Sequence, residues 1–326
     1  MPDSCAIIIP AINFNKDVQK CIDECILQKN VNVRIFLVTN KKIKKKIKAS
    51  KVKLVSFGDI NMSKKRNMAV KKCKEKFIAF IDSDAYPEKD WLYNGIEILK
   101  KNKNIGMVTG PDIPFKKQLG FSHYIALAHK SFLLSGNKFF RKNLKKNLIC
   151  KQASSCNMIL ERKIYKKIGG MNEKIYIGED KELCDKLNKI KKIMYSPNVL
   201  IYHKIRDFVP FILQRFSYGT SILDIVKSNK KIELNNIQYF IPLCVVFLYI
   251  AFLFFIHASF IGNLIFFLIL LLNSLILFES LRISLNPLKF SIIFIIIKLN
   301  ILSFGLGSIA KIMGLKKSIK KIYTKR

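Results

Sequence analysis

Acidic residues are scarce in this chain. It has 22 Asp and Glu against 58 Lys and Arg among 326 residues, which gives a net charge of +36. Half of the residues are nevertheless hydrophobic, and this excludes an intrinsically disordered chain, which requires low hydrophobicity. Cysteine is also sparse: eight cysteines form no C-x-x-C pair, which excludes a small disulfide-stapled domain.

Signatures of nucleic-acid binding are also missing. The sequence has no zinc-finger, helix-turn-helix or aromatic RNA-binding pattern. The excess of Lys and Arg therefore favours an anionic membrane surface or a phosphate-bearing substrate, and we expect no nucleic-acid partner. The alternative interpretation is a Lys-rich composition that places lysine on every solvated face.

Long uncharged runs occur only in the last third of the chain. Residues 239–257 and 260–278 contain no Asp, Glu, Lys or Arg. Each run has about the 20 residues that cross a hydrocarbon core of roughly 30 Å, so we predict two antiparallel transmembrane helices. A third apolar segment, 290–310, carries Lys298 and Asn300 near its middle. Spanning, re-entrant and interfacial placements of this segment remain open.

The basic residues predict which side of the membrane the rest of the chain occupies. They lie before the first uncharged run and in the tail, 311–326, which is typical of cytoplasmic segments. The apolar run that ends at Pro10 is too short for a signal peptide. We therefore expect a cytoplasmic domain over 1–230 with reduced cysteines, a membrane region over 238–310, and a multi-pass location in the inner (cytoplasmic) membrane.

Short apolar runs alternate with amphipathic segments in the first 110 residues. This alternation predicts an α/β fold with a mostly parallel sheet and helices on both faces. Segment 111–150 has no strand pattern. Its aromatic and basic residues favour an interfacial helix, with an ordinary insertion packing on the sheet as the alternative. The expected strands are 5–9, 33–38, 52–55, 77–81 and 105–109, and the expected helices are one capped by Asn15, then 63–73 and 88–100.

Two carboxylates follow the buried strand 77–81 directly. Asp82 and Asp84 would lie at the carboxyl end of that strand, where ligands bind in open α/β sheets. Hard divalent cations take one or two carboxylates together with phosphate oxygens, so the pair indicates a cation bound to a diphosphate. The alternative is that Asp84 caps a helix that begins near Glu88.

Several motifs occur in an order that resembles a family 2 glycosyltransferase with the GT-A fold. The resemblance covers about residues 4–222 and excludes the membrane region, which follows it as C-terminal transmembrane helices. The segments that carry it are CAIIIP at 5–10, SKKRN at 63–67, FIAFIDSDAYP at 77–87, NMILER at 157–162, IGGMNE at 168–173, GED at 178–180, YH at 202–203 and QRFSYG at 214–219.

The resemblance implies an inverting, metal-dependent hexosyltransferase. Its donor would be a nucleotide-diphosphate sugar, and its acceptor a lipid-linked or other membrane-associated glycan in cell-envelope polysaccharide or glycolipid assembly. Asp180 would be the catalytic base beside Glu179, although two acids in a first helical turn are also favourable without any catalysis. Asp84, Asp82 and His203 would hold Mg2+ or Mn2+. The implied donor-binding residues are Pro10, Asn40, Arg66, Asn67, Asp82, Asn157 and Arg215.

The sequence departs from the family pattern in two places. An acid that contacts the nucleobase in many members is replaced after the second strand by Asn40, whose amide would take over the contact. The Q-x-x-R-W motif of processive synthases is absent, because Gln214 and Arg215 are adjacent and Trp91 is the one tryptophan. This favours the addition of one sugar at a time. A polyprenyl-phosphate sugar synthase and a catalytically inactive membrane scaffold remain alternatives.

Overall fold

The computed structural model describes residues 2–41, 43, 51–115, 118–135, 144–175, 177–228, 240–255, 257 and 259–315. The chain divides into two compact units, and each is described by itself. The sheet unit contains residues 1–115 and 138–204, and the helical unit contains 116–137 and 205–326. Residues 116–137 and helix α8 (Phe208–Ser228), which lie within the predicted domain 1–230, cluster with the apolar helices, and the domain boundaries stay a prediction.

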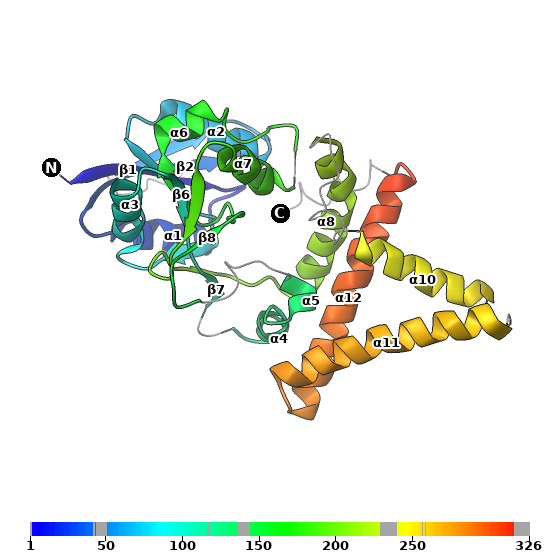
Figure 1. Cartoon of the computed structure of the whole chain (residues 1–326). Coiled ribbons are helices and arrows are strands. Elements are labelled where there is room, and N and C mark those ends of the chain that lie inside the picture. The colour runs from blue at the N-terminus through cyan, green and yellow to red at the C-terminus, as the bar shows by residue number, and fades with distance from the viewer. Residues whose placement is uncertain are drawn as a thin grey trace. The chain divides into compact units, whose positions relative to one another are not determined.

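The sheet unit is built on an eight-stranded sheet with the order β3-β2-β1-β4-β9-β6-β10-β8. Figure 1 shows β1, β2 and β6 of this sheet together with the helices of the same unit. β9 runs antiparallel to β4 and β6, β8 runs antiparallel to β10, and the other neighbours are parallel. The predicted mostly parallel sheet is thus confirmed. The strands are β1 (Asp3–Pro10), β2 (Val31–Thr39), β3 (Val52–Ser56), β4 (Phe77–Phe80), β6 (Ile105–Thr109), β8 (Leu148–Cys150), β9 (Met158–Glu161) and β10 (Lys192–Tyr195).

Helices cover both faces of this sheet, which is why β1 and β4 are apolar throughout. Alternate residues of β1 enter two separate cores: Ile7 and Ile9 lie in the core beneath α1 and α3, and Ile8 lies in the core beneath α2 and α7. Asn15 caps α1 as predicted, because its side chain accepts a hydrogen bond from the Val18 amide at 2.9 Å. The helices are α1 (Lys16–Ile26), α2 (Met62–Lys72), α3 (Trp91–Lys101), α6 (Arg162–Lys167) and α7 (Glu179–Asn188).

A second, three-stranded sheet has the order β5-β11-β7. It contains β5 (Ala85–Pro87), β11 (Ile201–His203) and β7 (Asp112–Pro114). The expectation that segment 111–150 lacks strands is wrong, since β7 and β8 both lie in it, and strands of three residues are too short to show a period of two. Asp84 precedes a strand and not a helix, and α3 begins at Trp91, later than predicted.

Long apolar helices dominate the helical unit. Two of its described helices are long and apolar enough to cross a membrane, over 260–283 and 287–312. The third apolar segment is one continuous helix through Lys298, whereas the first helix has 15 residues and is shorter than the predicted 239–257. Membrane crossing by each segment stays a prediction. The helices are α4 (Phe121–Ala128), α5 (Phe132–Ser135), α8, α10 (Ile241–Phe255), α11 (Ser259–Ile283) and α12 (Pro287–Ile312).

Glycine lets α8 and α12 approach closely. A Cβ atom on Gly219 of α8 would lie 1.9 Å from the backbone oxygen of Phe304 in α12. A Cβ on Gly307 of α12 would lie 1.9 Å from the backbone oxygen of Phe216 in α8. Each helix thus presents a glycine to the backbone of the other, the arrangement that membrane helices use for tight packing.

Segment 111–150 also supplies part of this helical unit. Ile125 of α4 is fully buried in the apolar cluster that includes Ile297 of α12. The carboxylate of Glu279 on α11 accepts hydrogen bonds from the Ser131 hydroxyl at 2.9 Å and the Phe132 amide at 3.0 Å. Its part over 118–135 therefore packs against the apolar helices, whereas β7 and β8 join the sheets, so each of the two predicted placements holds for part of the segment.

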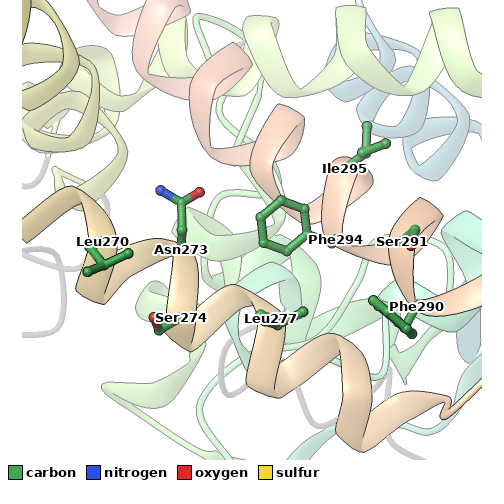
Figure 2. A pocket seen from close by; sticks show the side chains of 8 residues that line it. All are labelled: Leu270, Asn273, Ser274, Leu277, Phe290, Ser291, Phe294 and Ile295. Carbon is green, nitrogen blue, oxygen red and sulfur yellow. The ribbon is translucent and has the colours of Figure 1, made fainter. Parts of the chain in front are cut away.

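A groove of about 360 Å³ runs between α11 and α12 (Figure 2). Its lining offers amide and hydroxyl groups but no titratable side chain, so it has no group for acid–base chemistry or cation binding. The lining residues are Leu270, Asn273, Ser274, Leu277, Phe290, Ser291, Phe294 and Ile295.

Candidate active site

The two carboxylates of the D-x-D segment lie at the carboxyl end of β4, as predicted. β4 pairs with β1, and the Ile81 amide extends this pairing by donating to the Ile8 oxygen at 3.3 Å. The chain then turns, with the Ala85 amide donating to the Asp82 oxygen at 3.1 Å. The side chains of Asp82 and Asp84 are 33% and 34% exposed, so a ligand from solvent can reach both.

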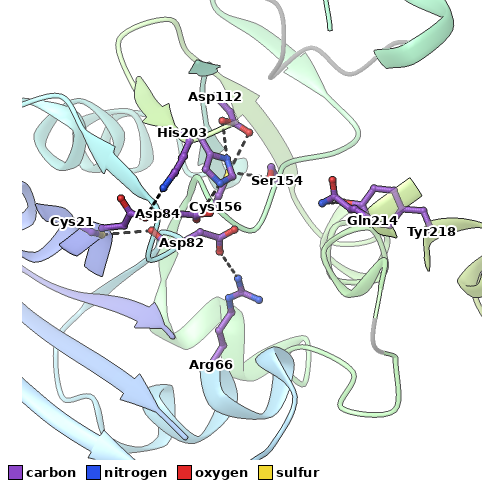
Figure 3. A network of polar contacts seen from close by, with 12 residues as sticks. Cys21, Arg66, Asp82, Asp84, Asp112, Ser154, Cys156, His203, Gln214 and Tyr218 are labelled. Carbon is purple, nitrogen blue, oxygen red and sulfur yellow. Dashed lines mark hydrogen bonds and ion pairs between the residues drawn. The ribbon is translucent and has the colours of Figure 1, made fainter. Parts of the chain in front are cut away.

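His203 lies between two carboxylates (Figure 3). Its Nε2 is 3.2 Å from Asp84 Oδ1, and its Nδ1 is 3.1 Å from Asp112 Oδ1. The small sheet creates this arrangement, because β11 pairs with β5 on one side and with β7 on the other. Burial opposes a positive charge on the ring, but Asp112 and Asp84 together raise the pKa of His203 well above its ordinary value.

Three of these side chains can hold a cation. One ligand atom each from Asp82, Asp84 and His203 lies within 4.8 Å of the others. Two carboxylates and an imidazole are suitable ligands for Mg2+ or Mn2+. The donor set therefore fits the predicted divalent cation. His203 also belongs to a second such group, with Asp112 and Cys156, and the thiol of Cys156 donates to Asp112 Oδ2 at 3.4 Å.

Arg66 connects the D-x-D segment to the start of α7. Its guanidinium is 3% exposed, with Nη2 at 2.8 Å from Asp82 Oδ1 and Nη1 at 3.5 Å from Glu179 Oε1. Its Nε is buried and has no hydrogen-bond partner among the residues that the structure describes. A buried cation beside the cation-binding carboxylates suits an anionic ligand such as a diphosphate.

The predicted base and its neighbour occupy the first turn of α7. Gly178 precedes them with a left-handed φ of 89°, a conformation that favours glycine. The Glu179 side chain is only 14% exposed and is close to Asp180, and these two effects raise the pKa of Glu179 to about 7 despite the opposing charge of Arg66. Asp180 accepts a hydrogen bond from the Lys181 amide at 2.8 Å. Glu179 thus lies beside Arg66, in the same polar network as Asp82, and Asp180 is the next residue in the chain.

Asn67, a predicted donor-binding residue, forms internal hydrogen bonds, and its contact with the donor stays a prediction. Its Oδ1 accepts hydrogen bonds from the Tyr165 hydroxyl at 2.6 Å and the Met171 amide at 3.1 Å. Its Nδ2 donates to the Met171 oxygen at 2.8 Å and to Glu173 Oε1 at 3.0 Å. Both the oxygen and the nitrogen of the amide are therefore hydrogen-bonded, and Asn67 links α2 to Met171 and Glu173 in the segment before α7.

Asn157 is also an internal connector, contrary to the predicted contact with the donor. The side chain is fully buried. Its Oδ1 accepts from the Trp91 indole at 2.8 Å, and its Nδ2 donates to the Val199 oxygen at 2.8 Å and the Pro111 oxygen at 3.3 Å. The amide therefore joins α3 to the segments that lead into β7 and β11.

The polar group at the end of β2 includes two residues that sequence reasoning missed, Lys65 and Asp59. The Asn40 amide donates to Asp59 Oδ1 at 2.8 Å, and its oxygen accepts a hydrogen bond from Lys65. Lys65 also donates to the Ala11 oxygen at 2.6 Å, and burial lowers its pKa to about 8. The sequence could have indicated Lys65, because it is adjacent to the predicted donor-binding residue Arg66. The Asn40 contact with the nucleobase stays a prediction.

The two remaining predicted donor-binding residues lie in different units. Pro10 is buried at the end of β1, opposite Val38 of β2. Arg215 belongs to the helical unit, where its guanidinium lies 4.9 Å from the ring centroids of Phe211 and Tyr218 and donates to Gln214 at 3.1 Å. Donor contacts by Pro10 and Arg215 stay predictions. The structure has no disulfide among its eight cysteines, and the reduced state of the seven cysteines in 1–230 stays a prediction.

Sheet topology and site together define a glycosyltransferase with the GT-A fold. Residues 6–169, just over half of the chain, match the model of Glycosyl transferase family 2, and the chain belongs to this family.

The chain is also similar to proteins of known structure or name. The mannosyltransferase PcManGT from Pyrobaculum calidifontis, in complex with GDP-Man and Mn2+, has the same fold, with a TM-score of 0.61, 13% identity and coverage of 95% of this chain and 87% of that one. A dolichyl N-acetyl-alpha-D-glucosaminyl phosphate 3-beta-D-2,3-diacetamido-2,3-dideoxy-beta-D-glucuronosyltransferase of Methanococcus voltae is 27% identical over 239 residues, 66% of this chain and 72% of that protein. GalNAc-T7 with UDP, GalNAc and Mn2+ is 14% identical with a TM-score of 0.47; the match covers 63% of this chain and 44% of that protein.

Proposed function

We propose that this protein transfers a single sugar from a nucleotide-diphosphate sugar to a lipid-linked acceptor at a membrane, with inversion at the anomeric carbon. One observation carries the proposal: the cation-binding group Asp82, Asp84 and His203 is joined through Arg66 to the paired acids that begin α7. A transferase needs charge neutralisation at the leaving group and a base for the acceptor. This site offers both within one polar network.

The cation-binding residues and Arg66 form the first half of the site, and this half would bind the leaving diphosphate. Asp84, Asp82 and His203 would hold Mg2+ or Mn2+, which neutralises the charge that develops on the diphosphate. Arg66 adds a second positive charge next to Asp82. Its buried Nε, without a hydrogen-bond partner among the described residues, is a further donor for a phosphate oxygen.

The paired acids Glu179 and Asp180 form the second half of the site, and this half would act on the acceptor hydroxyl. Asp180 takes the proton of this hydroxyl as the oxygen attacks the anomeric carbon from the side opposite the diphosphate. Burial and the negative charge of Asp180 raise the pKa of Glu179 to about 7, because two neighbouring carboxylates resist double ionisation. Arg66 limits this effect by its ion pair with Glu179.

The acceptor is proposed to carry a lipid because of two independent features. The Methanococcus voltae relative is named for a dolichyl-linked sugar phosphate, and the helical unit of this chain contains two apolar helices long enough to cross a bilayer. A net charge of +36 adds attraction to the anionic cytoplasmic leaflet. These features support a membrane enzyme of glycolipid or cell-surface polysaccharide assembly, with its catalytic residues in the cytoplasm.

The test is a transfer assay with full-length protein in nanodiscs. UDP-, GDP- and dTDP-sugars are supplied with Mn2+ or Mg2+ and with either polyprenyl diphosphate-linked sugars or polyprenyl phosphate. We expect one donor to be consumed and its sugar to appear on the diphosphate-linked acceptor. The same assay is run with Asp180→Asn, which removes the proposed base and should lose transfer. The matched control is Asp23→Asn, which changes an exposed acid on α1 and should keep transfer. Absence of donor cleavage with every pair would contradict the proposal, and transfer to polyprenyl phosphate would identify a polyprenyl-phosphate sugar synthase.

A further inference from the structure

The imidazole of His203 makes a polar contact at both of its nitrogens. Nε2 faces Asp84, one of the proposed cation ligands, and Nδ1 faces Asp112. Asp112 differs from Asp84 in exposure: its side chain is 2% exposed, against 34% for Asp84. Asp112 is therefore out of reach of a ligand from solvent, whereas Asp84 is accessible.

The backbone fixes both carboxylates relative to the ring. In the small sheet, Ile201 of β11 is opposite Asp112 of β7, and its amide donates to the Pro111 oxygen at 3.0 Å. On the other side, the Lys204 amide donates to the Asp84 oxygen at 3.0 Å. The ring consequently lies between two carboxylates whose main chains are hydrogen-bonded to the strand that carries it.

Asp112 is held in turn by a second contact. Its Oδ1 faces the imidazole, and its Oδ2 accepts a hydrogen bond from the Cys156 thiol at 3.4 Å. The Cys156 sulfur also lies 3.1 Å from the Ser154 hydroxyl. With each oxygen facing its own partner, the carboxylate cannot rotate without losing a contact.

A neutral imidazole can ligate a cation through one nitrogen only when the other nitrogen carries the hydrogen. An ionised carboxylate is purely an acceptor, so its neighbour must be the N–H group. Histidines that ligate metals generally donate their second N–H to a carboxylate or a carbonyl, and this contact sets the orientation of the ring. Asp112 stands at the position where such a partner is required.

We propose that Asp112 is a positioning residue: its buried carboxylate accepts the Nδ1–H of His203 and thereby directs the Nε2 lone pair toward the cation shared with Asp82 and Asp84. This inference rests on the proposed function, because it presupposes a divalent cation at that group. Asp112 touches neither cation nor donor and acts through His203 alone. With a cation bound, Nε2 would face the cation in place of Asp84 and release any proton it carries to solvent, while the Nδ1–Asp112 contact would stay in place.

The test is Mn2+ binding to the full-length protein, measured by the EPR signal of free Mn2+. Pulsed EPR of the bound ion reports the 14N coupling of a ligating imidazole. The variants are Asp112→Ala, which removes the acceptor, and Asp112→Asn, which keeps an acceptor oxygen of the same shape. Asp23→Asn is the control for loss of an acid elsewhere, and His203→Ala defines the signal without the imidazole.

We expect Asp112→Ala to weaken Mn2+ binding by about 10- to 100-fold and to reduce the 14N coupling toward that of His203→Ala. Asp112→Asn should weaken it less, and Asp23→Asn should bind as the wild type does. If Asp112→Ala does not fold, Asp112→Asn is compared with the wild type instead, and we expect it to bind Mn2+ more weakly.

Two contrary outcomes are distinguishable. Wild-type affinity and 14N coupling in both Asp112 variants would overturn the positioning role and leave the proposed transferase untouched. A wild-type protein that binds no Mn2+ and no Mg2+, the latter measured by competition, would overturn the cation in the proposed function and the role of Asp112 with it.

Discussion

Arg66 Nη2 lies 2.8 Å from Asp82 Oδ1, and the other terminal nitrogen of the same guanidinium lies 3.5 Å from Glu179. One buried cation therefore joins the proposed cation site to Glu179, the neighbour of the proposed base Asp180, although the two segments are almost 100 residues apart in the chain. This relationship makes the two halves of the site electrostatically dependent on each other.

Replacement of Arg66 tests this dependence. Arg66→Gln leaves the buried Glu179 without its opposing charge, so the free energy of unfolding should fall by about 2–3 kcal/mol. The pKa of Glu179 should rise further, because Arg66 lowers it in the wild type. Thermal unfolding measures the first effect and the pH dependence of transfer measures the second. An unchanged pH profile in a folded Arg66→Gln protein would contradict the coupling.

The raised pKa of Glu179 predicts the pH dependence of activity. Below its pKa of about 7 Glu179 is protonated, which removes the negative charge beside Asp180 and Arg66. Transfer should therefore decline below about pH 7, and Glu179→Gln should shift or abolish that limb. The profile of kcat/KM, measured for both proteins with the same donor, gives the comparison. An identical limb in both would assign it to another group.

The same shift has an opposite effect on stability. Because the folded state raises the pKa of Glu179 from 4.5 to about 7, it binds the proton more tightly than the unfolded chain does. The stabilisation from this group is present below about pH 4.5 and is lost as the pH rises through about 7. The difference in unfolding free energy between the wild type and Glu179→Gln should accordingly change over this window. A difference that is constant with pH would contradict the raised pKa.

Asn157 provides a test of its role as a connector. Asn157→Ala leaves the Trp91 indole and the Val199 oxygen without their buried partner, so stability should fall by about 2–4 kcal/mol. The KM for the donor should stay within about twofold once the protein is folded. Asn94→Ala, which removes one exposed hydrogen bond, is the control. A large rise in KM with unchanged stability would restore the predicted contact with the donor.

The close approach of α8 and α12 depends on glycine. Gly307→Ala places a methyl group against the backbone of Phe216, so the helices must separate, at a cost of about 1–3 kcal/mol. Leu306→Ala changes a neighbouring residue that is 49% exposed and should have a smaller effect. Thermal unfolding in the same detergent or nanodisc compares the two. An equal loss of stability in the two variants would show that the close glycine contact does not contribute to stability.

The parts of the fold that the sequence predicted are those with long patterns. β1 and β4 are continuous apolar runs, and α1 has both an apolar stripe and the cap residue Asn15. The small sheet was missed because strands of three residues have no recognisable period. Since this sheet brings His203 between two acids, Asp112 was absent from the predicted site.

The predicted site residues fall into two groups: side chains that gather at the cation site and side chains whose hydrogen bonds are internal to the protein. A sequence motif does not distinguish the two. Asp82, Asp84 and His203 come together as expected, because β11, which carries His203, pairs with β5, which directly follows the D-x-D segment. Asn67 and Asn157 lie in motifs of the family, but their amides are used inside the protein. Whether an amide faces a ligand or a backbone depends on tertiary packing, which a linear pattern does not contain.

The most direct test of the central claim is sugar transfer by the wild type, Asp84→Ala and Asp180→Asn, each full-length and in nanodiscs with the donor that the wild type consumes. We predict that both variants fold, that Asp84→Ala loses cation affinity as well as transfer, and that Asp180→Asn keeps cation and donor binding while transfer falls at least about 100-fold. Transfer at the wild-type rate by either variant would contradict this assignment of the site.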